Sequence, residues 1–230
     1  YQGIPLMQRA GLQPYEAFIA AFTIPMAALF ALTFGLLKAE DVAMTRHDIA
    51  KRLRLRRLTL RQAGWVLAGL IAMMLLAGLL APARFWILDM LPFTQPPQTF
   101  PPILHPLLQN EGLPDVAAAW MGPQATGNWG WALLALIVFF FNIMGEELFF
   151  RGYLLPRQEL LHGRYTWLAQ GLMWNLFHLP FYPWYLIYGL SLTLIIPFVA
   201  QRTRNTWTAV LLHALPNLPA TLLMIAMTVQ

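Results

Sequence analysis

Three long stretches without a charged residue constrain this chain more than any other feature of its sequence. Residues 17–37, 65–83 and 205–230 hold no Asp, Glu, Lys or Arg over 21, 19 and 26 positions. At about 1.5 Å per residue, each stretch could cross the ~30 Å hydrocarbon core of a bilayer as a helix. Hydrophobic residues make up 58% of the 230 positions and charged residues 11%, which is too apolar for a water-soluble domain of this length. The sequence therefore predicts a polytopic integral membrane protein.

The predicted fold is an all-α bundle, because lipid offers no partner to backbone groups outside a helix or a closed barrel. About six transmembrane helices are expected, at residues 16–37, 65–82, 129–150, 165–179, 184–200 and 206–227. We treat residues 1–230 as a single membrane domain. Its connection at 83–128 contains the stretch PFTQPPQTFPPILHP, whose six prolines exclude a regular helix there.

Positive charge gathers in three alternate connections of this six-span arrangement. Residues 38–64, 151–164 and 201–205 together hold thirteen of the fifteen Lys and Arg residues. The positive-inside rule places these connections in the cytoplasm and 83–128 on the other side. The run KRLRLRRLTLR at 51–61 is interpreted as a juxtamembrane cluster attracted to anionic head groups rather than as a nucleic-acid site. We expect a multi-pass protein of a bacterial inner membrane, with membrane lipids and no nucleic acid as partners.

The stretch GEELFFR at 145–151 places two carboxylates and an arginine directly after an uncharged segment, 129–145. Glu147 and Arg151 are four residues apart, so on one helix they share a face and pair. Glu146 projects about 100° away and has no local partner. Because an ionisable group at this depth costs at least ~2.5 to 3.5 kcal/mol, another group is expected to face it.

Two histidines, His178 and His213, lie inside predicted spans, and Asn217 follows His213 on the same helix face. Counted at about 1.5 Å per residue from the basic connections, Glu146 and both histidines lie ~12 to 20 Å deep. They can therefore meet in one cavity open to the cytoplasm. A buried carboxylate can act as a general base toward water. The amide of Asn217 can donate to an oxyanion, and a histidine can share that role or protonate a leaving amine.

These three stretches, EELFFR from 146, WNLFH from 174 and HALPN from 213, together resemble the motifs EExxxR, FxxxH and HxxxN of the CPBP intramembrane protease family. That family includes the type II CAAX prenyl endopeptidases and the bacteriocin-processing Abi group. The motif core is placed at about 129–227. One departure is Trp174, which stands where the motif usually has Phe and is expected to keep aromatic packing while altering the width of the pocket.

The resemblance implies an intramembrane endopeptidase that hydrolyses membrane-associated, prenylated or leader-type peptides. It implies that Glu146 activates water, that His178 and His213 are active-site histidines and that Asn217 is the oxyanion donor. Glu147 and Arg151 would form an ion pair that positions Glu146. The absence of cysteine removes thiolate nucleophiles and Cys-based metal sites. We expect no cofactor, with Zn(II) bound by Glu146, His178 and His213 as the alternative, although the HExxH spacing of zinc proteases is absent.

Simpler interpretations stand beside this one. The GEELFFR charges could be a helix-end cluster at the cytoplasmic surface, and each histidine could satisfy an interhelical hydrogen bond. A non-proteolytic immunity or scaffold protein would retain the pocket without turnover. A small-solute transporter would show inverted repeats, and the sequence shows none by inspection.

Overall fold

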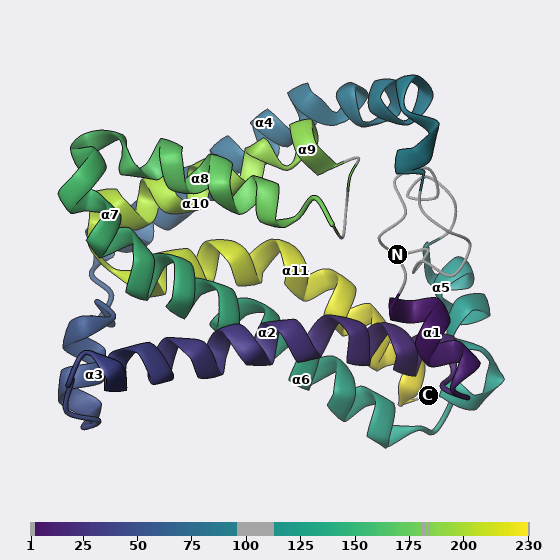
Figure 1. Ribbon diagram of the computed structural model, residues 1–230. Coiled ribbons are helices and arrows are strands. Elements are labelled where there is room, and N and C mark those ends of the chain that lie inside the picture. The colour runs from purple at the N-terminus through teal and green to yellow at the C-terminus, as the bar shows by residue number, and fades with distance from the viewer. Residues whose placement is uncertain (1–2, 96–112, 181–182, 184, 230) are drawn as a thin grey trace.

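The computed structural model describes residues 3–95, 113–180, 183 and 185–229, and these residues form helices and turns without a strand. The elements in chain order are α1 (Gly3–Arg9), α2 (Pro14–Ala39), α3 (Arg46–Arg52), α4 (Leu60–Met90), η1 (Pro92–Thr94), α5 (Leu113–Met121), η3 (Pro123–Ala125), α6 (Trp129–Glu146), η4 (Glu147–Leu154), α7 (Leu155–His162), η5 (Gly163–Tyr165), α8 (Thr166–Phe177), α9 (Tyr185–Tyr188), α10 (Leu190–Thr203) and α11 (Thr206–Thr228). The predicted all-α membrane bundle is confirmed (Figure 1).

Within the described residues, five helical stretches are long and apolar enough to cross a membrane, where the sequence predicted about six. They are Pro14–Ala39, Leu60–Met90, Trp129–Phe177, Tyr185–Thr203 and Thr206–Thr228. The difference lies in the third stretch, which reverses direction at α7 and η5 so that α8 runs back along the bundle (Figure 1). The predicted fourth span is thus α8, whose 12 residues cover only about 18 Å.

The helix α4 is longer than predicted, because Pro82 lies within it instead of ending it. A proline removes one backbone hydrogen bond, and transmembrane helices tolerate this loss because neighbouring helices, side chains and local backbone adjustments satisfy the freed carbonyl. The predicted connection 83–128 therefore begins with helical residues and also contains α5. Its central part, 96–112, lies outside the described residues.

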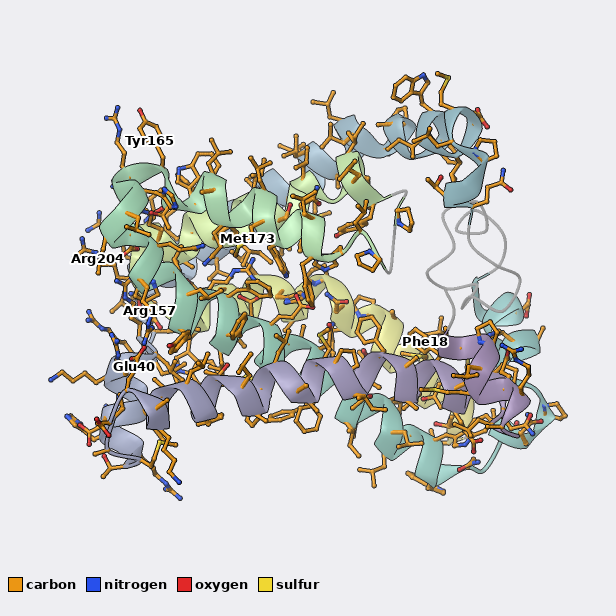
Figure 2. All side chains as sticks on the ribbon, viewed as in Figure 1. Phe18, Glu40, Arg157, Tyr165, Met173 and Arg204 are labelled. Carbon is orange, nitrogen blue, oxygen red and sulfur yellow. The ribbon has the colours of Figure 1, made fainter. Side chains whose placement is uncertain are left out.

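The three basic connections meet at one end of the bundle, as predicted. The hydroxyl of Thr206 donates to the carbonyl of Leu53 at 2.6 Å, and its backbone N–H donates to the carbonyl of Arg54 at 3.0 Å. Asn205 adds a hydrogen bond to the carbonyl of Arg56 at 3.0 Å. Figure 2 shows Glu40, Arg157 and Arg204 at this same end. The chain around residue 54 is thus fastened to the start of α11, and we call this contact the 54/206 staple.

Two glycines let helices approach closely around the middle of the bundle. A Cβ on Gly145 of α6 would lie 2.4 Å from the carbonyl oxygen of Met26 in α2. A Cβ on Gly171 of α8 would lie 2.5 Å from the carbonyl oxygen of Thr193 in α10. Only glycine permits contacts of this kind. The first of them fixes the position of α2 against the residue directly before Glu146.

Candidate active site

The six predicted site residues come from three parts of the fold that are distant in sequence. Glu146 is the last residue of α6, and Glu147 and Arg151 lie in the π-helical segment η4. His178 directly follows α8, while His213 and Asn217 lie in α11. π-Helical turns often occur at functional sites, since the extra residue per turn changes which side chains face a neighbouring helix.

The charged groups of the site are enclosed by the bundle. The exposed fraction is 2% for Glu146, 0% for Glu147, 1% for Arg151 and 4% for His213. His178 and Asn217 are partly buried. Such burial of ionisable side chains is expensive unless each has partners, so their contacts decide what the site can do.

Glu147 is the centre of a buried ion-pair cluster. Its Oε1 accepts hydrogen bonds from Nη1 of Arg151 at 3.0 Å and from Nδ1 of His213 at 2.8 Å. The predicted pairing of Glu147 with Arg151 is therefore confirmed. The contact with His213 was not predicted, and it joins η4 to α11 directly. Among the described residues, no group hydrogen-bonds Oε2 of Glu147 or Nε and Nη2 of Arg151.

Trp174 contacts Glu146 directly and also contacts Arg151 and His213, the two partners of Glu147. Its indole Nε1 donates to Oε2 of Glu146 at 2.6 Å. The guanidinium of Arg151 lies over the indole ring, with its carbon 3.6 Å from the ring centroid. Such stacking compensates a buried guanidinium that makes few hydrogen bonds. Trp174 is fully buried, and its one side-chain N–H donates to the carboxylate of Glu146.

Both histidines pack edge-on against the same tryptophan. The ring centroids of His178 and His213 lie 5.1 and 5.4 Å from that of Trp174. His178 is close enough to Glu146, His213 and Arg151 for their charges to act on it. Sequence reasoning expected the two imidazoles to converge on Glu146, and the structure gathers all three around Trp174.

The hydrogen bonds of the histidines fix where each ring carries its proton. Nδ1 of His178 lies 2.8 Å from the carbonyl oxygen of Trp174, and Nδ1 of His213 faces a carboxylate oxygen. Because both neighbours are acceptors, Nδ1 is the protonated nitrogen in each neutral ring, and Nε2 carries the lone pair.

Asn217 is held by its own helix. Its Nδ2 donates to the carbonyl of His213 at 2.9 Å, which occupies one of its two N–H groups. The other N–H is the one that an oxyanion could use. Its predicted role as oxyanion donor stays a prediction.

The zinc alternative stays a prediction. Among the described residues, no three His, Cys, Asp or Glu side chains are grouped so that they could hold a metal ion. Nδ1 of His213 faces Glu147 and Oε2 of Glu146 accepts from Trp174, so a metal held by these two residues would have to use Nε2 and Oε1.

Two cavities, of about 480 and 600 Å³, lie at the basic end of the bundle. The first is lined by residues of α7, η5, α8 and α10, including Arg164, Trp167 and Phe198. The second is lined mainly by residues 42–56 and includes Lys51 and Arg56. Neither is lined by any of the six site residues. The predicted cytoplasm-facing cavity at Glu146 stays a prediction.

Two further side chains around the site were missed as site residues. Trp174 was expected only to pack, although its place in the second motif marked it. Tyr185 of α9 packs against His178 with ring centroids 5.6 Å apart, and no motif marked it.

One family model matches the part of the chain that contains these residues. Residues 128–219 match the family model described as "Rce1-like: Type II CAAX prenyl endopeptidase Rce1-like". This stretch contains all six predicted site residues and Trp174. No curated protein and no solved structure matches the chain significantly.

Proposed function

We propose that this chain cleaves peptide bonds with water activated by Glu146. The premise is that it belongs, through residues 128–219, to the Rce1-like type II CAAX prenyl endopeptidase family. Its substrates are membrane-associated peptides, with prenylated C-terminal peptides as the class that the family's name points to. The observation that carries the proposal is that Glu146, an enclosed carboxylate that is 2% exposed, contacts the same tryptophan, Trp174, as the imidazoles of His178 and His213.

The chemistry follows from which oxygen of Glu146 is engaged. Oε2 accepts from Trp174, and none of the described residues hydrogen-bonds Oε1. In the proposed reaction, Oε1 takes a proton from water while the water oxygen bonds to the scissile carbonyl carbon. The carbonyl oxygen becomes an oxyanion, stabilised by Asn217 and a histidine. The C–N bond then breaks, and the proton passes from Glu146 to the leaving amine.

We also propose that the basic end faces the cytoplasm of a bacterial inner membrane. The meeting of residues 38–64, 151–164 and 201–205 at one end supports this orientation, because Lys and Arg accumulate on the cytoplasmic side of membrane proteins. Substrate would then reach Glu146 from the cytoplasm or from the inner leaflet.

Replacing Glu146 by Gln tests the proposed function. Purified protein in detergent or nanodiscs would be incubated with a fluorogenic prenylated CAAX peptide and its unprenylated form. We expect E146Q to lose at least about a thousandfold in kcat/KM while keeping the wild-type melting temperature, since Gln preserves shape but cannot take a proton.

Glu159→Gln is the matched control, because it makes the same chemical change in a salt bridge at the basic end. It should cleave like the wild type. Full activity of E146Q would overturn the mechanism. A second outcome would favour the non-proteolytic immunity or scaffold function instead. In that outcome neither the wild type nor E159Q cleaves any peptide, and cells that carry E146Q behave like cells that carry the wild type.

A further inference from the structure

Trp174 occupies the one motif position at which this chain departs from the FxxxH pattern, and it contacts Glu146, Arg151 and both histidines of the site. Its N–H donates to Glu146 at 2.6 Å, its face carries Arg151 at 3.6 Å, and its edges meet His178 and His213. A phenylalanine could provide the ring contacts but has no N–H to donate. The departure therefore adds a hydrogen bond as well as changing the size of the ring.

We infer that Trp174 is a positioning residue through which the Glu147 and Arg151 ion pair holds Glu146 in its reactive orientation. This inference rests on the proposed function, since it assigns the N–H of Trp174 to the carboxylate that activates water. Among the described residues, the carboxylate that Arg151 hydrogen-bonds is that of Glu147 and not that of Glu146. Trp174 is the side chain that links the two.

The physical link is the polarisation of the indole ring. A guanidinium over the ring face draws electron density toward itself, and this makes the indole N–H a stronger donor. A donor to an ionised carboxylate forms a short, strong hydrogen bond, in agreement with the 2.6 Å distance. Rotation of the carboxylate would break the bond from Trp174 to Oε2, so this bond favours the orientation in which Oε1 is left to take the proton from water in the proposed reaction.

The first test is the pH dependence of cleavage by Trp174→Phe. We expect kcat to fall about ten- to a hundredfold with KM changed less than about twofold, because a fully buried residue does not touch substrate. The acid limb of the profile of kcat/KM against pH should move up by about one pH unit, since the ionised form of Glu146 loses its donor. A purely structural defect would lower activity without moving this limb.

Trp131→Phe is the matched control. Its indole Nε1 donates to a carboxylate oxygen of Glu16 at 3.3 Å, near the opposite end of α6 and away from the site. The same chemical change there should leave both kcat and the acid limb as in the wild type. If W174F matches the wild type in both while E146Q is inactive, the inference is wrong and the proposed function stands.

The second test needs no activity. In protein labelled with ¹⁵N at its nine Trp indoles, the Trp174 N–H resonance is assigned by its absence in W174F, or in W174Y if the first variant does not fold. A short bond to a carboxylate shifts this proton downfield, so E146Q should move it upfield and E159Q should not. A Trp174 resonance that does not respond to E146Q would overturn the hydrogen bond itself, whatever the protein cleaves.

Discussion

The buried site and the basic end of the bundle each contain an ion pair between an arginine and a glutamate, and the two pairs differ in how far they are buried. Arg151 and Glu147 meet at 3.0 Å with both side chains 0% exposed. Arg54 and Glu159 form a partly buried pair near the surface through two bonds, of 3.0 and 2.6 Å, with exposures of 19% and 17%. The surface pair has the better geometry, and in the buried pair two guanidinium nitrogens receive no hydrogen-bond partner from the part of the chain that the structure describes.

The difference in burial between the two pairs indicates a different role for each. A buried ion pair gains little stability over a hydrophobic replacement, but removing one partner is costly. The buried pair therefore serves to place charges at a chosen point, where Arg151 stacks on Trp174 and Glu147 binds His213. The surface pair connects α7 to the segment before α4, in water that screens it.

The largest effect is expected for Arg151→Met, which leaves the Glu147 carboxylate buried with only His213. The free energy of unfolding, measured by denaturant titration in mixed micelles, should fall by about 3 to 5 kcal/mol. Glu147→Gln combined with Arg151→Met removes both charges and should recover part of this loss. If the single variant is as stable as the wild type, the two pairs do not differ in the way described.

A smaller effect is expected for Arg54→Met, the same substitution at intermediate burial. Here the loss should be about 1 kcal/mol, because the partner Glu159 can turn to water. In 1 M salt the difference from wild type should shrink further, while cleavage stays unchanged at all salt concentrations. A loss as large as that of Arg151→Met would remove the distinction between the two regions.

Arg52→Met should have the smallest effect in this series. Its bond to Glu40 is 2.8 Å, but the side chain is 41% exposed, and Arg157 also binds Glu40. We expect a change within about 0.5 kcal/mol. The three variants measured together thus test burial as the controlling variable, and an order of losses that does not follow burial would contradict it.

The pH dependence of stability tests how much the charge of Glu40, at the basic end of the bundle, contributes to the fold. Hydrogen bonds from Arg157, Tyr153 and Arg52 lower the pKa of Glu40 from 4.5 to about 2. A lowered carboxyl pKa stabilises the fold above the unfolded value and loses this effect as pH falls toward the folded one. The wild type should therefore melt higher than Glu40→Gln by a constant margin above about pH 5. That margin should disappear between about pH 5 and pH 2, and a margin independent of pH would show that the charge of Glu40 is not responsible.

Sequence reasoning predicted much of the fold and of the candidate site. Hydropathy identified the membrane helices, and charge counting predicted that the three basic connections meet. The spacing of Glu147 and Arg151 predicted their pair, which survives in a π-helical segment. These features depend on local spacing or on composition, both of which are visible in a single sequence.

The remaining features depend on how helices face one another. The contact between His213 and Glu147 requires knowing the rotation of α11 against η4, and the bond from Trp174 to Glu146 requires knowing that of α8 against α6. The reversal at α7 and η5, which made α8 too short to count as a span, depends on tertiary packing of an apolar segment. No pattern of hydrophobicity specifies these rotations, since α6, α8 and α11 are apolar over most of their surface and show no strongly amphipathic pattern.

The 54/206 staple also sets an order of events during synthesis. Residues 53 and 54 leave the ribosome about 150 positions before Thr206, their partner, which at ~5 to 20 residues per second is a delay of roughly 8 to 30 s. His213, the contact of Glu147 on α11, arrives later still. A nascent chain therefore carries Glu146 and Glu147 out of the ribosome before Trp174 and His213, the residues that hydrogen-bond them, have been made.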